Sequence, residues 1–283
     1  MLLFWRFVSH VSFILPYFSL SQSSEIEKLV RGEEEPAFIE SIGKLFGTPG
    51  FVFPFSAFIM SISVTNIVGT FIDEVMERGG VTDQFGIDLA GAGFEFGILF
   101  GGIIIGGFVD KTKKYKEVTK ACILASMVLL VPLGLTEHTL GKEPLLLVLA
   151  LLGLGTTAGP IQPINAELAV DVTYPSDETA VESVQQIGGN LVSALLVPLI
   201  EIASKQDYQL LPQVPALASD IRGDVVLLLA LTIVTYFYFD NFDSPLRRTM
   251  ADTASGEGDV IDIEAVGING EFASAQRDLV SKR

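Results

Sequence analysis

Apolar residues recur along this chain in runs long enough to cross a lipid bilayer. A membrane-spanning helix needs about 17 to 25 predominantly apolar residues, and six such runs are separated by shorter polar stretches. They cover residues 51–72, 88–109, 118–136, 144–166, 180–203 and 225–240. The pattern therefore predicts an all-α fold, a polytopic membrane helix bundle over residues 51–240.

The first twenty residues, 1–20, form another hydrophobic stretch with two interpretations. Arg6 and His10 interrupt it, and Pro16 would kink it if it were a helix. A secretory signal peptide is one interpretation, but Arg6 lies inside the apolar run and no clear small-x-small cleavage site follows. These features favour a transmembrane helix, which would give a bundle of seven helices instead of six.

Basic residues between the spans predict the orientation of the bundle. Cytoplasmic loops are enriched in Lys and Arg, and the loop 110–120 holds five lysines. Arg247 and Arg248 follow the last span, an even number of crossings away, so both segments are expected in the cytoplasm. The linker 25–44 then lies on the same side. Alternation places three loops outside, at residues 73–87, 137–143 and 204–224.

The segments on either side of the bundle are predicted to be solvated. Residues 21–50 form a charged cytoplasmic linker, and residues 241–283 form an acidic cytoplasmic tail that is expected to be largely disordered. A short helix over 36–46 would gather five apolar side chains on one face, which suits a helix lying along the membrane surface. They are Phe38, Ile39, Ile42, Leu45 and Phe46.

Composition supports a membrane protein surrounded by lipid. Of the 283 residues, 49% are apolar and 18% are charged, whereas soluble domains carry about a quarter charged residues. The formal charge of −16 argues against a nucleic-acid partner. Cys122 is the single cysteine and lies in an apolar run, so no intrachain disulfide forms and a buried packing role is expected.

No catalytic arrangement accompanies the spans. His10 and His138 lie far apart, no Gly-rich loop is followed by Lys-Ser or Lys-Thr, and no His-Glu-x-x-His motif occurs. The chain is therefore not expected to be an enzyme, and neither a cofactor nor a metal ion is expected.

The loop after the second span carries a recognisable motif. The span ends in GGIIIGGFVDKTKKYK, in which Gly106 precedes Asp110 by four residues and Lys113 and Lys114 follow. Glycine lets a neighbouring helix approach closely, and a carboxylate at a helix C-terminus is unfavourable unless paired. The stretch resembles the loop signature of major facilitator transporters, which implies that Asp110 latches one conformation across the bundle. A plain positive-inside loop is the alternative.

A second motif, AELAVDVTYPSDET, ends span four. Glu167, Asp171 and the Thr-Tyr-Pro run at 173–175 resemble the FE-x-A-x-E-(I/L)-TYP-x-x-E stretch of the feline leukaemia virus subgroup C receptor-related transporters, a branch of the major facilitators. Three more pieces resemble that family in the same order: SIGKLFGTPGF at 41–51, DKTKKYK in the lysine loop and SPLRR at 244–248. The resemblance thus covers residues 41–248.

This resemblance implies a fold and a function. The six spans correspond to family helices seven to twelve, and residues 1–20 fall where helix six belongs. Major facilitators have two six-helix halves that rock about a central site, so the chain is either an incomplete gene product or one half that pairs with a second. The implied function is alternating-access transport of a small organic solute of the choline, ethanolamine or haem class. The alternative is a receptor, assembly partner or incomplete fragment that does not transport.

Polar side chains within the spans are candidates for a solute path. A charge at bilayer depth costs roughly 2.5 kcal/mol or more and usually faces the bundle interior. Glu95 stands where the related transporters usually carry an apolar residue; it is a coupling carboxylate, a paired structural acid or a group near the outer interface. The uncharged candidates, which either line a path or join helices, are Asn66, Gln162, Asn165, Gln185, Gln186 and Asn190.

Two of these positions bear on the solute. Aligned without gaps, Asn190 stands where choline-transporting relatives carry a glutamine and keeps that chemistry. Asn66 stands where they carry a tyrosine, and the loss of an aromatic face, which holds quaternary ammonium groups well, puts choline in doubt. Pro160 and Pro163 are expected to kink or unwind span four. Glycines suited to close packing are Gly97, Gly101, Gly102, Gly106, Gly107, Gly153, Gly155 and Gly159.

Overall fold

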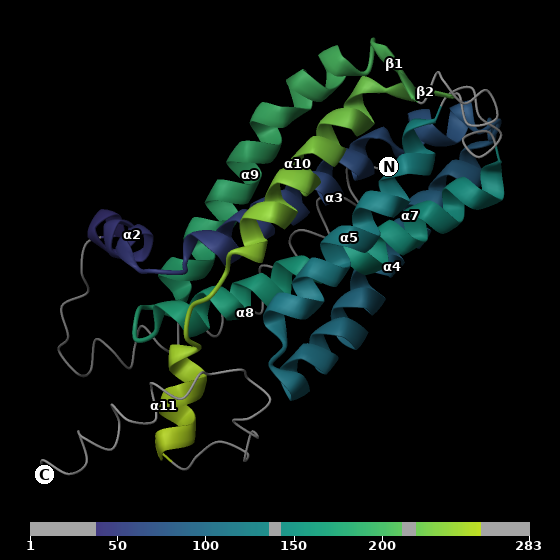
Figure 1. Cartoon of the computed structure of the whole chain (residues 1–283). Helices are drawn as coiled ribbons and strands as arrows, with labels where there is room; N and C mark the ends of the chain where they lie inside the picture. The colour runs from purple at the N-terminus through teal and green to yellow at the C-terminus, as the bar shows by residue number, and fades with distance from the viewer. Residues whose placement is uncertain (1–37, 136–142, 211–218, 256–283) are drawn as a thin grey trace, which may run out of the picture.

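The computed structural model describes residues 38–135, 143–210 and 219–255, which form a bundle of helices with one short hairpin (Figure 1). The predicted stretch 1–20 and most of the linker and tail lie outside these residues. The helices are α2 (Phe38–Gly47), α3 (Val52–Arg78), α4 (Gln84–Thr112), α5 (Tyr115–Gly134), α7 (Pro144–Ala158), α8 (Ile161–Thr173), α9 (Glu178–Ala203), α10 (Gly223–Asp240) and α11 (Arg247–Ser255). The strands are β1 (Asp207–Leu210) and β2 (Ser219–Arg222).

Six helical stretches are long and apolar enough to span a membrane, which confirms the predicted all-α membrane bundle. They are α3, α4, α5, the consecutive pair α7 and α8, α9 and α10. Some helices continue through polar residues beyond their apolar runs, and α3 reaches Arg78. The Arg78 Nη2 donates a hydrogen bond to the Leu133 carbonyl at 2.8 Å. The predicted loop 73–87 is therefore only a few residues long.

Span four breaks between α7 and α8, as the two prolines predict. Pro160 and Pro163 lack an N–H, and a proline ring clashes with the preceding turn of a helix. The Gln162 N–H bonds to the Gly159 carbonyl at 3.2 Å instead of continuing the α-helical pattern. The Ala158 carbonyl, freed by this change, accepts a bond from the buried Ser61 hydroxyl of α3 at 2.6 Å. A side chain of the neighbouring helix α3 thus supplies the hydrogen bond that the freed carbonyl needs, as is required where a helix breaks within a bilayer.

Glycines bring α4 and α7 into backbone contact. A Cβ atom built at Gly97 would meet the Leu152 carbonyl oxygen, and one at Gly155 would meet the Phe94 carbonyl oxygen. A Cβ atom at Gly101 would meet the Thr156 carbonyl oxygen, and one at Gly159, directly after α7, would lie 2.9 Å from the Ile98 Cα, so each segment presents a Gly-x-x-x-Gly pair to the other. The predicted packing role is confirmed for these four.

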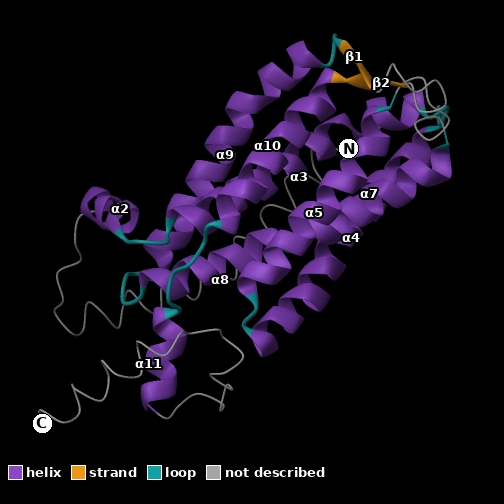
Figure 2. Cartoon of the chain, in the orientation of Figure 1, coloured by secondary structure: helices purple, strands orange, loops and turns teal. Residues whose placement is uncertain are grey.

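Two features at the ends of the bundle differ from the sequence expectations. The predicted outer loop 204–224 contains the antiparallel hairpin β1–β2, the only strands in the described ranges (Figure 2). At the opposite end the tail begins with α11 (Figure 1), although the tail is expected to lack regular structure.

Helix α2 forms where the sequence predicts a short helix, and its Leu45 is buried against residues of α8 and α9.

The helices differ in how much of their surface the bundle covers. Helix α3 is the most buried of the six spans, whereas α9 and α4 are the least buried. Large apolar side chains stay exposed along both, at Phe96, Leu99, Ile103, Ile187, Leu191 and Leu195. Cys122 is buried, as expected.

Candidate functional site

A chain of polar side chains joins α3 to α8 and α9. The Asn66 amide donates to the Ser193 hydroxyl at 3.4 Å, and Ser193 donates to Ser63 at 3.3 Å. One residue away on α3, Thr65 accepts a bond from the Gln162 amide at 3.1 Å. Hydroxyl and amide groups that bond across helices hold a bundle together, and the same groups offer donors and acceptors to a solute.

Four of the predicted path residues lie exposed near the middles of their helices. Asn66 follows residue 65, the midpoint of α3, and Asn190 lies at the midpoint of α9. Glu95 is three residues before residue 98, the midpoint of α4, and Gln186 lies one turn before Asn190. Transporter solute sites lie near the bilayer midplane, and a mid-helix position is the position in these helices that such a site would use.

Glu95 has neither a hydrogen bond nor an ion pair with any described residue. Nearby on α4, Gly102 and Gly106 also face open space, because nothing described lies within 4 Å of a Cβ atom built at either. The close helix approach predicted at Gly106 is therefore not made inside this part of the chain.

Asn165 is placed differently from the other path candidates. It is 0% exposed, and its amide donates to the Thr119 hydroxyl at 3.1 Å and to the Ile161 carbonyl at 2.8 Å. Gln185, also 0% exposed, donates to the Asn165 carbonyl at 3.1 Å. These amides join α5, α8 and α9 and do not reach an open face. Helical geometry turns Gln185 inward and its neighbour Gln186 outward.

The two sequence motifs meet at one end of the bundle. Tyr115, buried at the start of α5, interacts electrostatically with Asp110, Glu167 and Asp171. Lys113 ends α4 in the left-handed conformation (φ 52°), and its ammonium group lies 3.4 Å from the Tyr115 hydroxyl. The lysine loop and the second motif thus form one polar cluster.

Within this cluster, Asp110 and Lys114 are exposed at the ends of α4 and α5. No described residue pairs with Asp110, so a latch partner is not found in the described part of the chain. Two other lysines of the loop are engaged: Lys116 donates to the Phe242 carbonyl at 2.7 Å, and Lys120 pairs with Asp240. Both contacts place a cation at the negative C-terminal end of α10.

Asp171 has partners that the sequence did not predict. Its carboxylate accepts bonds from the Arg248 N–H at 2.9 Å and from the Thr249 hydroxyl at 2.6 Å. Arg248 also forms an ion pair with Glu178 at 2.8 Å. The second motif and the SPLRR segment, about 70 residues apart, are therefore in direct contact.

A buried ionic network at the hairpin end was not predicted either. Arg222, 6% exposed, pairs with Glu74 of α3 and, at 2.7 Å, with Asp224 of α10. Burial alone would lower the pKa of Arg222, but its hydrogen bonds with the two carboxylates raise that pKa above the usual value. Arg222 therefore stays charged and joins the hairpin to two spans.

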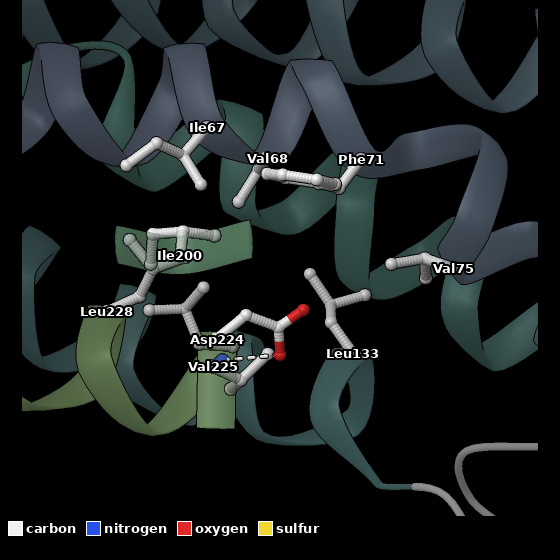
Figure 3. Close-up of a pocket in the computed structure, with 10 residues that line it drawn as sticks. Ile67, Val68, Phe71, Val75, Leu133, Ile200, Asp224, Val225 and Leu228 are labelled. Carbon is white, nitrogen blue, oxygen red and sulfur yellow. Dashed lines mark hydrogen bonds between the residues drawn. The ribbon is translucent and has the colours of Figure 1, made fainter. Parts of the chain in front are cut away.

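Beside this network lies a small apolar pocket between α3, α5, α9 and α10 (Figure 3). Asp224 is its only charged lining residue, and both carboxylate oxygens are engaged, by Arg222 and by the Val225 N–H at 2.7 Å. The pocket offers no free polar group, so it is not the solute site. Among the described residues, no group of three or more His, Cys, Asp or Glu side chains is placed to hold a metal ion.

Comparison with known proteins finds sequence similarity to solute carriers. It is 29% identical over 168 residues to solute carrier family 49 member A3 of Xenopus tropicalis, and 22% identical over 164 residues to the protein of that name from Danio rerio. The chain is homologous to a solute carrier. Each match covers 58% of this chain and 34% of the relative, so the chain spans about a third of the length of the curated relatives it matches. No family model matches.

This homology and the six apolar helices support an integral, multi-pass membrane protein. The relatives are named as solute carriers and not as enzymes. Spans of this length and hydropathy imply contact with lipid.

Proposed function

We propose that this chain forms the C-terminal half of a major-facilitator-type transporter that moves a small organic solute by alternating access. The observation that carries the proposal is the set of exposed mid-helix polar residues, Asn66, Glu95, Gln186 and Asn190, on three helices. Polar side chains at this depth are unfavourable against lipid and suit a water-filled path.

Glu95 gives the strongest support. A carboxylate at the centre of a bilayer costs roughly 2.5 to 3.5 kcal/mol when inserted in a lipid-facing helix, and no described group neutralises Glu95. Its surroundings on α4 include Gly102 and Gly106, which leave room for another helix. A second six-helix half on this side would remove Glu95 from lipid and close a path between the halves.

Solute uptake into vesicles tests the proposal. The longest reading frame containing this chain is reconstituted, and choline, ethanolamine, haem and a wider metabolite panel are offered. Transport of at least one organic solute faster than into empty vesicles is expected. Choline is the weakest candidate, because Asn66 supplies no aromatic face to a quaternary ammonium group. If none of the solutes enters faster than into empty vesicles, the proposal is wrong.

Asp110→Asn is expected to slow transport about tenfold or more while leaving expression unchanged. The amide keeps the size of the side chain but removes the charge, and a hydrogen bond to a charged group contributes roughly 1.5 to 3 kcal/mol. In the proposed transporter the partner of Asp110 would lie in the second half, and losing this bond would redistribute inward- and outward-facing states.

The measurements are uptake rate and the accessibility of loop residues to a water-soluble reagent. Glu117→Gln is the matched control, since Glu117 is an exposed carboxylate in the first turn of α5. Equal rates and equal accessibility in Asp110→Asn and the unmodified protein would show that Asp110 is merely solvated.

The lysine loop predicts that the tail after Arg248 and the linker around Glu33 are cytoplasmic. A protease added outside sealed, right-side-out cells is therefore expected to leave both segments intact. A membrane-impermeant amine reagent should instead reach Lys205, which is exposed at the hairpin end. External cleavage of the tail in intact cells would reverse the orientation.

A further inference from the structure

Helix α11 is held to the bundle chiefly by one buried carboxylate. Asp171, at the end of α8, is 2% exposed. Its Oδ1 accepts bonds from the backbone N–H groups of Arg248 at 2.9 Å and Thr249 at 3.3 Å, and its Oδ2 accepts the Thr249 hydroxyl at 2.6 Å. The first N–H groups of a helix have no partner inside it. Asp171 therefore caps α11 from a different helix.

An ion pair provides a second contact between α11 and the bundle. The Arg248 guanidinium lies 2.8 Å from the Glu178 carboxylate, in the first turn of α9. Asp171 precedes the turn between α8 and α9, and Glu178 follows it. The first turn of α11 therefore contacts residues on both sides of the α8–α9 turn.

Helix α11 is short and lies largely outside the core. It has only nine residues, RRTMADTAS, and none of those with a described side chain is fully buried. Isolated helices shorter than about 12 to 15 residues are marginal in water. Figure 1 shows α11 extending away from the bundle at its end opposite the hairpin. Its anchored first turn therefore contributes much of its order.

We propose that α11 is a releasable strap on the α8–α9 turn, with Asp171 as its anchor. While capped, α11 is helical and the turn is held; when the cap is lost, α11 unfolds and the turn loosens. The two effects are coupled, since whatever stabilises the docked strap stabilises the turn by the same amount. Negative charge added at Thr249 would face the Asp171 carboxylate, which the Thr249 hydroxyl now contacts, and release the strap by repulsion.

Hydrogen exchange on the full chain in lipid nanodiscs tests this proposal. In Asp171→Ala, amide exchange in residues 247–255 is expected to rise roughly tenfold, which is the scale of a lost helix cap. Cleavage by trypsin after Arg247 and Arg248 should accelerate similarly. Asp171→Asn, which keeps one oxygen for the N–H groups, should fall between Asp171→Ala and the unmodified chain.

Thr249→Glu provides a variant that leaves the bundle interior unchanged, should Asp171→Ala fold poorly. It is expected to match Asp171→Ala, whereas Asp243→Ala, which removes an exposed carboxylate just before α11, should change nothing. Exchange in residues 176–181 of the α8–α9 turn should rise together with exchange in α11. Unchanged protection of α11 in Thr249→Glu would overturn the anchor, and released α11 with an unchanged turn would overturn the coupling.

Discussion

Replacing Arg222 with alanine is expected to destabilise the bundle by about 3 to 5 kcal/mol, the cost of removing one partner from a buried ion pair. Arg222 and Asp224 have side chains that are 7% and 9% exposed. Without the guanidinium, the buried Asp224 carboxylate loses its ion-pair partner, and the hairpin loses its link to Glu74 of α3.

The measurement is the free energy of unfolding in mixed micelles titrated with a denaturing detergent, followed by far-ultraviolet circular dichroism. Lys205→Ala is the control. It breaks the Lys205–Glu201 pair, whose side chains are 68% and 67% exposed and whose charges are 3.9 Å apart, and exposed pairs contribute about 0 to 1 kcal/mol. Equal stabilities of the two variants would refute a structural role for the network.

Gly155→Ala is expected to cost about 1 to 3 kcal/mol, the usual penalty for an extra methyl group in a tightly packed contact. The new Cβ would lie against the Phe94 carbonyl oxygen and 3.1 Å from the Ile98 nitrogen, which are backbone atoms that cannot rotate away. Helices α4 and α7 would have to separate.

Gly102→Ala is the matched control in the same unfolding titration. Nothing described lies within 4 Å of the added Cβ, and alanine favours a helix over glycine by about 1 kcal/mol. This variant should therefore be as stable as the original chain or slightly more stable. A Gly155→Ala protein that unfolds at the same detergent fraction would contradict the backbone contact.

The membrane spans and the proline break could be predicted because their causes are local. A run of apolar residues specifies a membrane helix by itself, and Pro160 disrupts its own turn whatever surrounds it. The spacing of Gly97 and Gly101, and of Gly155 and Gly159, indicates helix packing in the same way. What the spacing does not indicate is that these two pairs face each other while Gly102 and Gly106 face open space.

Long-range polar contacts could not be predicted. Arg222 and Glu74 are 148 residues apart and meet only because α3 ends and α10 begins at the same side of the bundle. Asp171 was singled out by its motif, but its partners on α11 lie in a tail without a hydrophobic pattern. Asn165 and Asn190 look alike in sequence, and only the packing of α8 and α9 buries the first and exposes the second.

We propose that the exposed mid-helix amides contribute to a solute path. The most direct measurement compares solute uptake by the original protein, by the double variant Asn66→Leu, Asn190→Leu, and by Leu124→Ala, a change at an exposed apolar residue of α5. The proposed path predicts uptake above that of empty vesicles, a loss of roughly tenfold or more in the double variant, since buried polar solute groups would lose their partners, and no loss in Leu124→Ala. Uptake that is unchanged in the double variant would contradict it.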